Sequence, residues 1–211
     1  MLLDEGFDVT VASSDRERIA AAAVTLGRAH AVPGDVANEP DCSSIVAAHR
    51  ERFGRLDVLV NSAGILHHGP LEELALVDWD RQLAVNVTGT FLMTKHSIPL
   101  LRDSRGLIVN MASMAGKTGN PGLAAYGATK AAVISLTQAL NAELEPDGVR
   151  AISICPGFVD TPMAAISTIH RQEMIQPVDV AEIIRTTLRL SPHAHIPEVV
   201  IARTRRPTPS D

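Results

Sequence analysis

Short apolar segments alternate along the chain with longer segments of helical periodicity. Segments rich in β-branched and apolar residues predict strands at residues 8–13, 28–32, 56–61, 107–111, 149–155 and 199–202. Between them, longer segments predict helices at residues 15–26, 38–53, 78–102, 123–144 and 178–190. Strands joined through helices of this length form right-handed parallel units. The pattern therefore predicts an α/β fold with a doubly wound parallel sheet.

Local signals set the limits and the inner faces of some of these helices. Asn38 is a suitable N-cap for helix 38–53, and Gly54 follows Phe53 as a stop signal. Segment 56–61 is apolar almost throughout, which is typical of a strand buried on both faces. In helix 78–102, the apolar spacing predicts a core-facing side made of Leu83, Val87, Phe91 and Ile98.

Composition narrows the class of protein. A chain of 211 residues with 45% hydrophobic residues fits a single domain, expected at 1–202, with a loose Pro- and Arg-rich tail at 203–211. Aromatic residues make up 3% and the net charge is −5, which argues against nucleic-acid binding. Cys42 and Cys155 form no disulfide framework, and no apolar run is long enough to span a bilayer. We expect a cytoplasmic protein without a membrane or nucleic-acid partner.

Small and hydroxyl residues follow three of the predicted strands. Strand 56–61 leads into Asn61-Ser62-Ala63-Gly64, strand 107–111 into Ala112-Ser113, and strand 149–155 into Pro156-Gly157. In an open parallel sheet, ligands bind beyond the carboxyl ends of the strands. Small residues there let the backbone approach a flat ligand. Together the strand ends predict a slot for an extended cofactor, although each alone is only a loop signal.

The most informative pair is Tyr126 and Lys130. They lie four positions apart on a predicted helix, so the phenol and the ammonium can point into the same cleft. A free tyrosine has a pKa near 10, and acid–base work near pH 7 needs a drop of roughly 3 units, or about 4 kcal/mol. A neighbouring cation favours the phenolate and supplies part of that drop. A solvated surface pair is the weaker interpretation, because Tyr126 is the single tyrosine and lysines number three.

These motifs resemble the short-chain dehydrogenase/reductase family. The resemblance rests on Tyr126-x-x-x-Lys130, on Ser113 13 positions before the tyrosine, on Asn86, on Asn61-Ser62-Ala63-Gly64 and on the segment 156–161, all in order. It covers nearly the whole chain and implies a Rossmann-like fold and hydride transfer between a nicotinamide cofactor and a ketone or secondary alcohol.

The resemblance also implies roles for individual residues. Tyr126 is expected to be the general acid/base, Ser113 to hydrogen-bond the substrate oxygen, Lys130 to lower the pKa of Tyr126 and bind the nicotinamide ribose, and Asn86 to hold a water that links Lys130 to solvent. Asp35 and Val36 resemble the pair that contacts adenine. The residues expected to bind the cofactor are Ser13, Arg16, Asp35, Val36, Asn61, Ala63, Gly64, Tyr126, Lys130, Pro156, Gly157, Val159 and Thr161.

The sequence departs from the family pattern at its beginning. The family starts with a strand and a Thr-Gly-x-x-x-Gly-x-Gly turn that binds the pyrophosphate at a helix N-terminus. Here the first residues resemble the end of the following helix, so this strand and turn are expected to be missing. Either the true start lies upstream of Met1, or the chain is a catalytically inactive remnant that serves as an oligomerising or binding module. The intact Asn86, Ser113, Tyr126 and Lys130 favour the first explanation.

The remaining signals concern cofactor choice, metals and partners. Ser13 and Ser14 stand where a carboxylate would select NAD, and Arg16 can attract a 2′-phosphate, so NADP is preferred while NAD stays possible. No metal site is predicted, because the histidines lack partners at ligand spacing. Met111, Met114, Met163 and Met174 are expected to line an apolar substrate pocket, and for Met111 and Met114 filling the core is an equally good interpretation. By the resemblance, the helices around Phe91 and Ile134 pack against a second subunit, giving a homodimer or homotetramer.

Overall fold

The computed structural model describes residues 1–191 and 193–204 and contains the predicted strands and helices, except that the segment predicted as one helix at 78–102 is divided. The strands are β1 (Thr10–Ser13), β2 (His30–Pro33), β3 (Val58–Asn61), β4 (Leu107–Met111), β5 (Arg150–Pro156) and β6 (Glu198–Ile201). The helices are α1 (Arg16–Leu26), α2 (Glu39–Phe53), α3 (Leu76–Leu83), α4 (Gly89–Ser104), α5 (Ala124–Leu144) and α6 (Pro177–Leu188). Most of the predicted tail, residues 205–211, lies outside the described residues.

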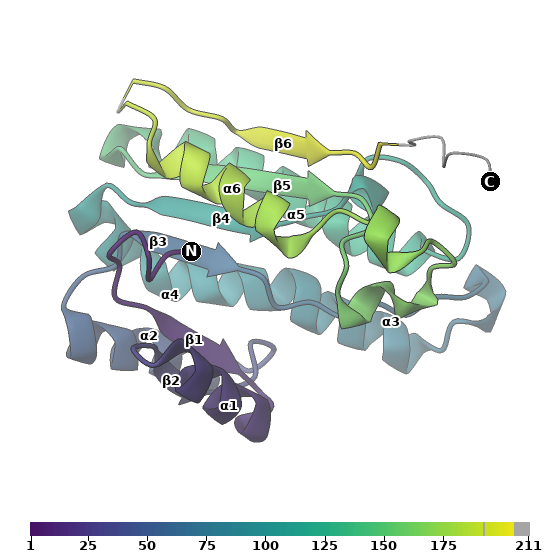
Figure 1. Ribbon diagram of the computed structural model, residues 1–211, viewed down its shortest axis with the longest axis horizontal. Helices are drawn as coiled ribbons and strands as arrows, with labels where there is room; N and C mark the ends of the chain where they lie inside the picture. The colour runs from purple at the N-terminus through teal and green to yellow at the C-terminus, as the bar shows by residue number, and fades with distance from the viewer. Residues whose placement is uncertain (192, 205–211) are drawn as a thin grey trace.

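Every strand pair in the described structure is parallel, as the alternation of strands and helices predicts. The strands form two sheets, one with the order β1-β2 and one with the order β3-β4-β5-β6. Figure 1 shows the smaller sheet below the larger one, with β1 and β3 at the facing edges. Among the described residues, no strand pairing joins β1 to β3, so the sheet is divided at this point.

Helices cover both faces of the larger sheet. Leu107 and Val109 of β4 pack in one cluster with Val180 and Ile184 of α6. Ile108, between them in sequence, packs in the other cluster with residues of α4 and α5. Because successive side chains of a strand point to opposite faces, this division places α6 on one face and α4 and α5 on the other (Figure 1). The doubly wound architecture is thus confirmed.

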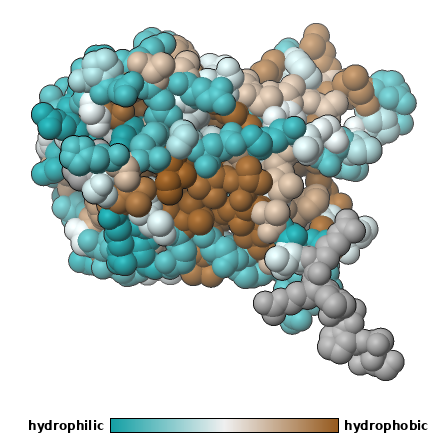
Figure 2. Space-filling view, turned by 90° about the horizontal axis from the view of Figure 1, so that it is seen from above, coloured by the Kyte–Doolittle hydropathy of each residue, from teal (hydrophilic) through white to brown (hydrophobic). Residues whose placement is uncertain are grey.

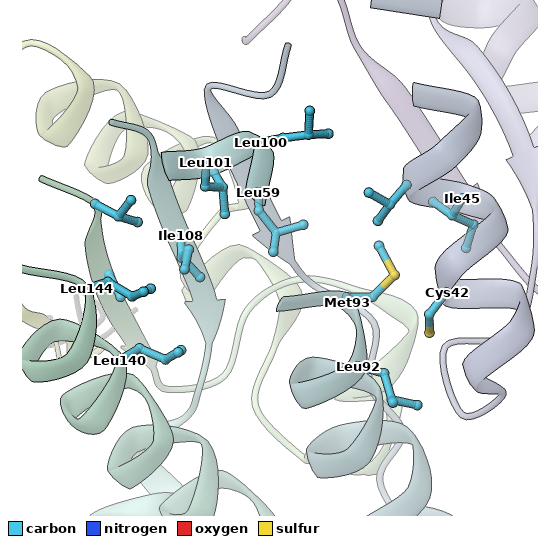
Figure 3. Packing of buried hydrophobic residues seen from close by; sticks show 13 residues of the cluster. Cys42, Ile45, Leu59, Leu92, Met93, Leu100, Leu101, Ile108, Leu140 and Leu144 are labelled. Atoms are coloured by element: carbon cyan, nitrogen blue, oxygen red, sulfur yellow. The ribbon is translucent and has the colours of Figure 1, made fainter. Parts of the chain in front are cut away.

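Helix α2 connects the smaller sheet to the rest of the molecule through side-chain packing. Its buried residues Cys42, Ile45 and Val46 belong to the same cluster as Leu92 and Met93 of α4. Figure 3 shows Cys42 and Ile45 facing Met93 across this junction. Helix α2 begins and ends as predicted, because Asn38 accepts a hydrogen bond from the Asp41 amide and Gly54 adopts a left-handed conformation with φ 74°.

The prediction for residues 78–102 is wrong in two respects. The segment is not one α-helix: a π-helical turn, Ala84–Thr88, separates α3 from α4. Phe91 is 46% exposed instead of facing the core. The buried face carries polar residues at helical spacing, namely Gln82, Asn86, Thr90, Thr94 and Ser97. Ile98 packs against the core as the apolar spacing predicts, whereas Phe91 is misplaced because the inner side of this segment also holds hydrogen-bonding groups.

Candidate active site

Tyr126 and Lys130 lie one helical turn apart near the start of α5, and both side chains are buried. The ammonium Nζ of Lys130 lies 5.6 Å from the centre of the Tyr126 ring. It donates a hydrogen bond of 2.6 Å to the backbone carbonyl of Met111, the last residue of β4. The predicted pairing on one helix face is present, and it sits at the carboxyl end of a central strand.

Ser113 follows β4 and faces the same place. Its Oγ accepts a hydrogen bond from the Ala115 amide at 3.1 Å, which begins the short turn Met114–Gly116. The same hydroxyl lies 3.5 Å from the carbonyl oxygen of Pro156, at the end of β5. It is also close enough to the phenol of Tyr126 to favour its ionised form. The carboxyl ends of β4 and β5 therefore bring Ser113, Tyr126 and Lys130 together.

Asn86 is fully buried in the π-helical turn. Its side chain accepts a hydrogen bond from the Ile65 amide at 2.8 Å and donates one to the Ile65 carbonyl at 2.9 Å. It also donates to Oγ1 of Thr129, the neighbour of Lys130, at 3.0 Å. Asn86 thus ties the loop after β3 to α5. The role expected from the resemblance, that of holding a water for Lys130, remains a prediction.

Burial controls the proton affinities of the pair. Desolvation raises the pKa of the Tyr126 phenol above its usual value, while the neighbouring Ser113 hydroxyl acts in the opposite direction. Desolvation also lowers the pKa of Lys130 to about 8. The role expected of Lys130, that of lowering the Tyr126 pKa, remains a prediction, and burial of the phenol acts against it. The physical reason is that both groups lie in surroundings that disfavour charge.

The end of β3 presents small residues to the same edge of the sheet. Gly64 lies close to the catalytic candidates, since a Cβ atom there would be 3.4 Å from Oδ1 of Asn86 and 3.6 Å from Nζ of Lys130. Asn61 is turned inward instead, and its Nδ2 donates to Thr94 and to Asn110 of β4. Ala63 is exposed at the surface. Gly64 is thus the member of this motif that borders the pair.

The predicted adenine-binding residues lie beyond β2. The carboxylate of Asp35 accepts hydrogen bonds from the Ala37 amide and from Arg81, and these contacts hold the pKa of Asp35 below its usual value. The side chain of Val36 packs against Gly89, at the start of α4. A cavity of about 10 Å³, enough for roughly one water molecule, adjoins this contact. Its lining includes Val36, Asn61, Ala63, Val85, Gly89, Thr90 and Met93.

The remaining predicted cofactor residues occupy the ends of β1 and β5. Ser13 ends β1, and its hydroxyl accepts a hydrogen bond from the Asp15 amide. Arg16, the first residue of α1, is exposed. Pro156 ends β5, and the amide of Gly157 donates to Ile201 of β6. Beyond them, Val159 forms a parallel bridge with Ile175, and the hydroxyl of Thr161 donates to the Val159 carbonyl at 3.3 Å.

The structure adds residues to the site whose roles the sequence analysis missed. Thr129 joins Asn86 to the carbonyl of Tyr126, and Gln82 accepts a hydrogen bond from the His67 amide. Their signal in the sequence is a polar side chain next to Lys130 in the case of Thr129, and one helical turn before Asn86 in the case of Gln82. Met163, one of the four methionines expected at an apolar substrate pocket, lies with Sδ 4.0 Å from the Tyr126 hydroxyl.

Comparisons with known proteins agree with this geometry. Residues 1–172 match the family model described as short chain dehydrogenase. An uncharacterised oxidoreductase of Staphylococcus aureus (strain USA300) is 31% identical over 204 residues, covering 95% of this chain and 88% of that protein. Two solved structures are also similar, and both are complexes with nicotinamide cofactors or their derivatives.

The first is an alcohol dehydrogenase from the archaeon Thermococcus sibiricus complexed with 5-hydroxy-NADP. It has a TM-score of 0.89 and 25% identity, covering 98% of this chain and 91% of its own. The second is a 3-ketoacyl-(acyl-carrier-protein) reductase from Brucella melitensis complexed with NADH. It has a TM-score of 0.88 and 28% identity, and the match covers 95% of this chain and 87% of the reductase chain. With the family model matched over most of its length, the chain belongs to the short-chain dehydrogenase family of oxidoreductases.

Proposed function

We propose that this protein transfers a hydride between a nicotinamide cofactor and a ketone or secondary alcohol, with Tyr126 as the general acid/base. The observation that carries the proposal is the meeting of Ser113, Tyr126 and Lys130 at the carboxyl ends of β4 and β5. A phenol, a hydroxyl and an ammonium at one point supply a proton, a hydrogen-bond donor and a positive charge for a reacting carbonyl oxygen.

The proton transfer follows from this arrangement. In the direction of reduction, the bound cofactor supplies a hydride to the carbonyl carbon. Tyr126 gives its phenolic proton to the carbonyl oxygen, which forms the alcohol and leaves a phenolate. Ser113 donates a hydrogen bond to the same oxygen while negative charge develops on it, and the ammonium of Lys130 stabilises the phenolate. The reverse reaction uses the phenolate as base.

The chain offers residues for the nicotinamide end and for the adenosine end of the cofactor. Near the reacting carbon, Gly64 offers close backbone approach and Lys130 a donor for ribose hydroxyls. Toward the adenosine end, exposed Arg16 supports a preference for NADP over NAD, because its guanidinium can pair with a 2′-phosphate. The cofactor residues named from the sequence belong to this proposal.

For the pyrophosphate, we propose a further parallel strand between β1 and β3 that carries the glycine-rich turn of the family. The division of the sheet supports it, since β1 and β3 present unpaired parallel edges to each other in the described part of the chain. The same observation favours a second candidate function, that of a non-catalytic oligomerising or binding module. Without a phosphate-binding turn, such a module would keep the fold and lose the cofactor.

Cofactor titration and turnover separate the two functions. NADPH and NADH are titrated into the chain by fluorescence, and their oxidation is followed with a panel of ketones. Reduction of a ketone that is lost in Tyr126→Phe, with cofactor affinity retained, supports the enzyme. A folded chain that reduces no ketone, even when a segment carrying the proposed further strand and its turn is fused to it, supports the module. Because the glycine-rich turn is not seen among the described residues, we expect weak NADPH binding, and micromolar affinity would contradict the proposed missing turn.

Cofactor choice has its own test. We expect Arg16→Ala to weaken NADPH binding about tenfold and to leave NADH unchanged, because a charged hydrogen bond contributes roughly 1.5–3 kcal/mol. Arg18→Ala, an exposed arginine on the same helix, is the matched control. Equal effects of Arg16→Ala on both nucleotides would contradict the preference for NADP.

We also propose that the protein forms a homodimer or homotetramer in the cytoplasm. Figure 2 views the molecule from the side of β6 and shows an apolar area in the middle of that face. Val200 on β6 is 45% exposed, and Phe91 on α4 is 46% exposed. Both observations favour apolar surfaces that a second copy covers. In the part of the chain that the structure describes, no helix combines the length and apolar character needed to cross a bilayer.

A further inference from the structure

The group nearest the hydroxyl of Tyr126 on the open side of the site is a thioether. Met163 belongs to the 3-10 turn Pro162–Ile166, and its Sδ lies 4.0 Å from the phenolic oxygen. Its side chain is 38% exposed, so it is reached from solvent and from the tyrosine alike. A carbonyl compound placed against Tyr126 therefore meets a soft, uncharged neighbour with one of its substituents.

The surroundings of Met163 are apolar as well. Phe158 and Ile166, on either side of it in the same segment, are 37% and 41% exposed. On the strand side, the sulfur of Met114 lies 3.4 Å from the position that a Cβ of Gly157 would take. Exposed apolar side chains are costly to leave in water, so the presence of three of them in the segment that brings Met163 to Tyr126 indicates a surface for an apolar substituent.

Backbone hydrogen bonds hold this segment in place. The amide of Ile175 donates to the Phe158 carbonyl at 3.0 Å, and the amide of Asp160 donates to the Ile175 carbonyl at 2.8 Å. The 3-10 turn closes through the Ala164 amide and the Thr161 carbonyl at 3.0 Å. Met163 is thus presented by an anchored segment, and its contact with Tyr126 is part of the fold.

Apart from Lys130, whose ammonium donates to the Met111 carbonyl, the cations considered for this surface are paired with carboxylates. Segment 158–176 contains one arginine, Arg171, whose Nε lies 2.5 Å from the carboxylate of Asp160 in the same segment. Arg203 is paired with Glu173 at 3.2 Å, and Lys117 with Glu198 at 2.6 Å. An anionic substituent entering here would have to compete with a carboxylate for each of these cations. The pairing of these cations favours a neutral ligand.

We propose that the substrate side of this site takes neutral carbonyl compounds with an apolar substituent, and that Met163 is the residue that selects them against carboxylates. This inference rests on the proposed function, because it uses Tyr126 as the point where the carbonyl binds. Met163 acts through contact with the substituent and takes no part in the proton transfer.

The test measures binding to the chain without requiring turnover. The methionine methyl groups are labelled with carbon-13, and Met163→Leu assigns the Met163 signal in the NMR spectrum. The probes are 2-heptanone and 2-oxoheptanoate, which share chain length and differ in the carboxylate. We expect 2-heptanone to shift the Met163 signal at concentrations at least tenfold lower than 2-oxoheptanoate. Met93, buried between α2 and α4, is the internal control and should not shift.

The alkyl chain length of the ketone and substitutions at Met163 provide further tests of this binding preference. From 2-pentanone to 2-heptanone, affinity should rise by roughly threefold for each added methylene. Met163→Lys should reverse the preference in favour of 2-oxoheptanoate, whereas Met163→Leu should keep it. Met163→Gln, which is polar and uncharged, should weaken the binding of 2-heptanone severalfold without strengthening the binding of 2-oxoheptanoate. This variant replaces Met163→Lys in the test if the lysine variant does not fold.

The outcomes separate this inference from the proposed function. Wild-type protein that binds 2-oxoheptanoate as tightly as 2-heptanone, or that binds neither, overturns the inference. So does a preference that Met163→Lys leaves unchanged. If 2-heptanone binds as expected and no ketone is reduced with NADPH or NADH, the proposed function fails and the binding preference stands. Reduction of 2-oxoheptanoate in preference to 2-heptanone supports the function and overturns the inference.

Discussion

Replacing Asn86 by alanine tests whether this side chain holds the active-site loop. Asn86 is fully buried and makes three hydrogen bonds, two to the backbone of Ile65 and one to Thr129. A hydrogen bond contributes about 1 kcal/mol net, and leaving a buried partner unpaired costs about 1–3 kcal/mol. Ile65 is half-buried, so water reaches part of the vacated space. We therefore expect Asn86→Ala to lower the free energy of unfolding by about 3 kcal/mol.

Urea unfolding followed by circular dichroism measures this loss. With a denaturant slope of about 2 kcal/mol/M, the midpoint should fall by about 1.5 M. Asn120→Ala is the matched control, because Asn120 is exposed and its side chain makes one hydrogen bond, to the Thr118 carbonyl. The control should change the free energy of unfolding by less than about 0.5 kcal/mol.

An isosteric variant tells whether the donors or the acceptor of Asn86 matter. Asn86→Asp keeps an oxygen for the Ile65 amide and loses both donated hydrogen bonds, so its loss should exceed that of the control. A loss below about 1 kcal/mol in Asn86→Ala would refute the reasoning, because it would mean that the three contacts are replaced at little cost.

Three further predictions use buried or crowded positions. Because burial lowers the pKa of Lys130 from 10.5 to about 8, its charge destabilises the fold fully below pH 8 and progressively less as the pH rises toward 10.5. Lys130→Met should therefore raise the free energy of unfolding by about 2 kcal/mol at pH 7, with a smaller gain at pH 10; a gain that does not shrink would contradict the lowered pKa. Burial also lowers the pKa of His49, so the free energy of unfolding should fall as the pH drops below 6.5. Urea unfolding at pH 7 and pH 5 should show a smaller fall in the free energy of unfolding for His49→Gln than for the wild type. A Cβ at Gly116 would lie 2.6 Å from the backbone of Lys130, whereas one at Gly119, in the same loop, meets nothing within 4 Å. Gly116→Ala should thus cost about 1–3 kcal/mol and Gly119→Ala close to none by urea unfolding, and equal losses would count against the close packing of this loop on α5.

Much of the fold follows from local signals in the sequence. The parallel arrangement follows from the alternation of strands and helices along the chain. The cap at Asn38 and the stop at Gly54 depend on residues next to the helix end that they form. The failure at residues 78–102 has a different origin. There the inner face is set by what the neighbouring loop and helix need, so Asn86 is buried while Phe91 is exposed. Apolar spacing carries no information about such partners.

The residues of the candidate site could be predicted from the sequence, whereas the directions of their pKa shifts could not. Spacing on one helix and the rule for strand ends suffice to bring Tyr126, Lys130 and Ser113 together. The direction of the Tyr126 pKa depends on how deeply the phenol is buried, which the sequence does not state. The thioether of Met163 comes from a segment 37 positions away in sequence, so its contact with the phenol needed the tertiary structure.

The division of the sheet bears on how the molecule opens. Strands β1 and β2 are paired with each other and, among the described residues, with no strand of the larger sheet. Their attachment runs through α2, whose side chains pack on α4, through Met1, which packs on the cluster below α6, and through ion pairs of Glu5 with Arg185 and Arg189. Breaking these contacts requires no loss of strand–strand hydrogen bonds. The amino-terminal quarter of the chain can therefore detach and reclose as one cooperative unit, at a lower free energy than global unfolding, while β3 to β6 stay assembled.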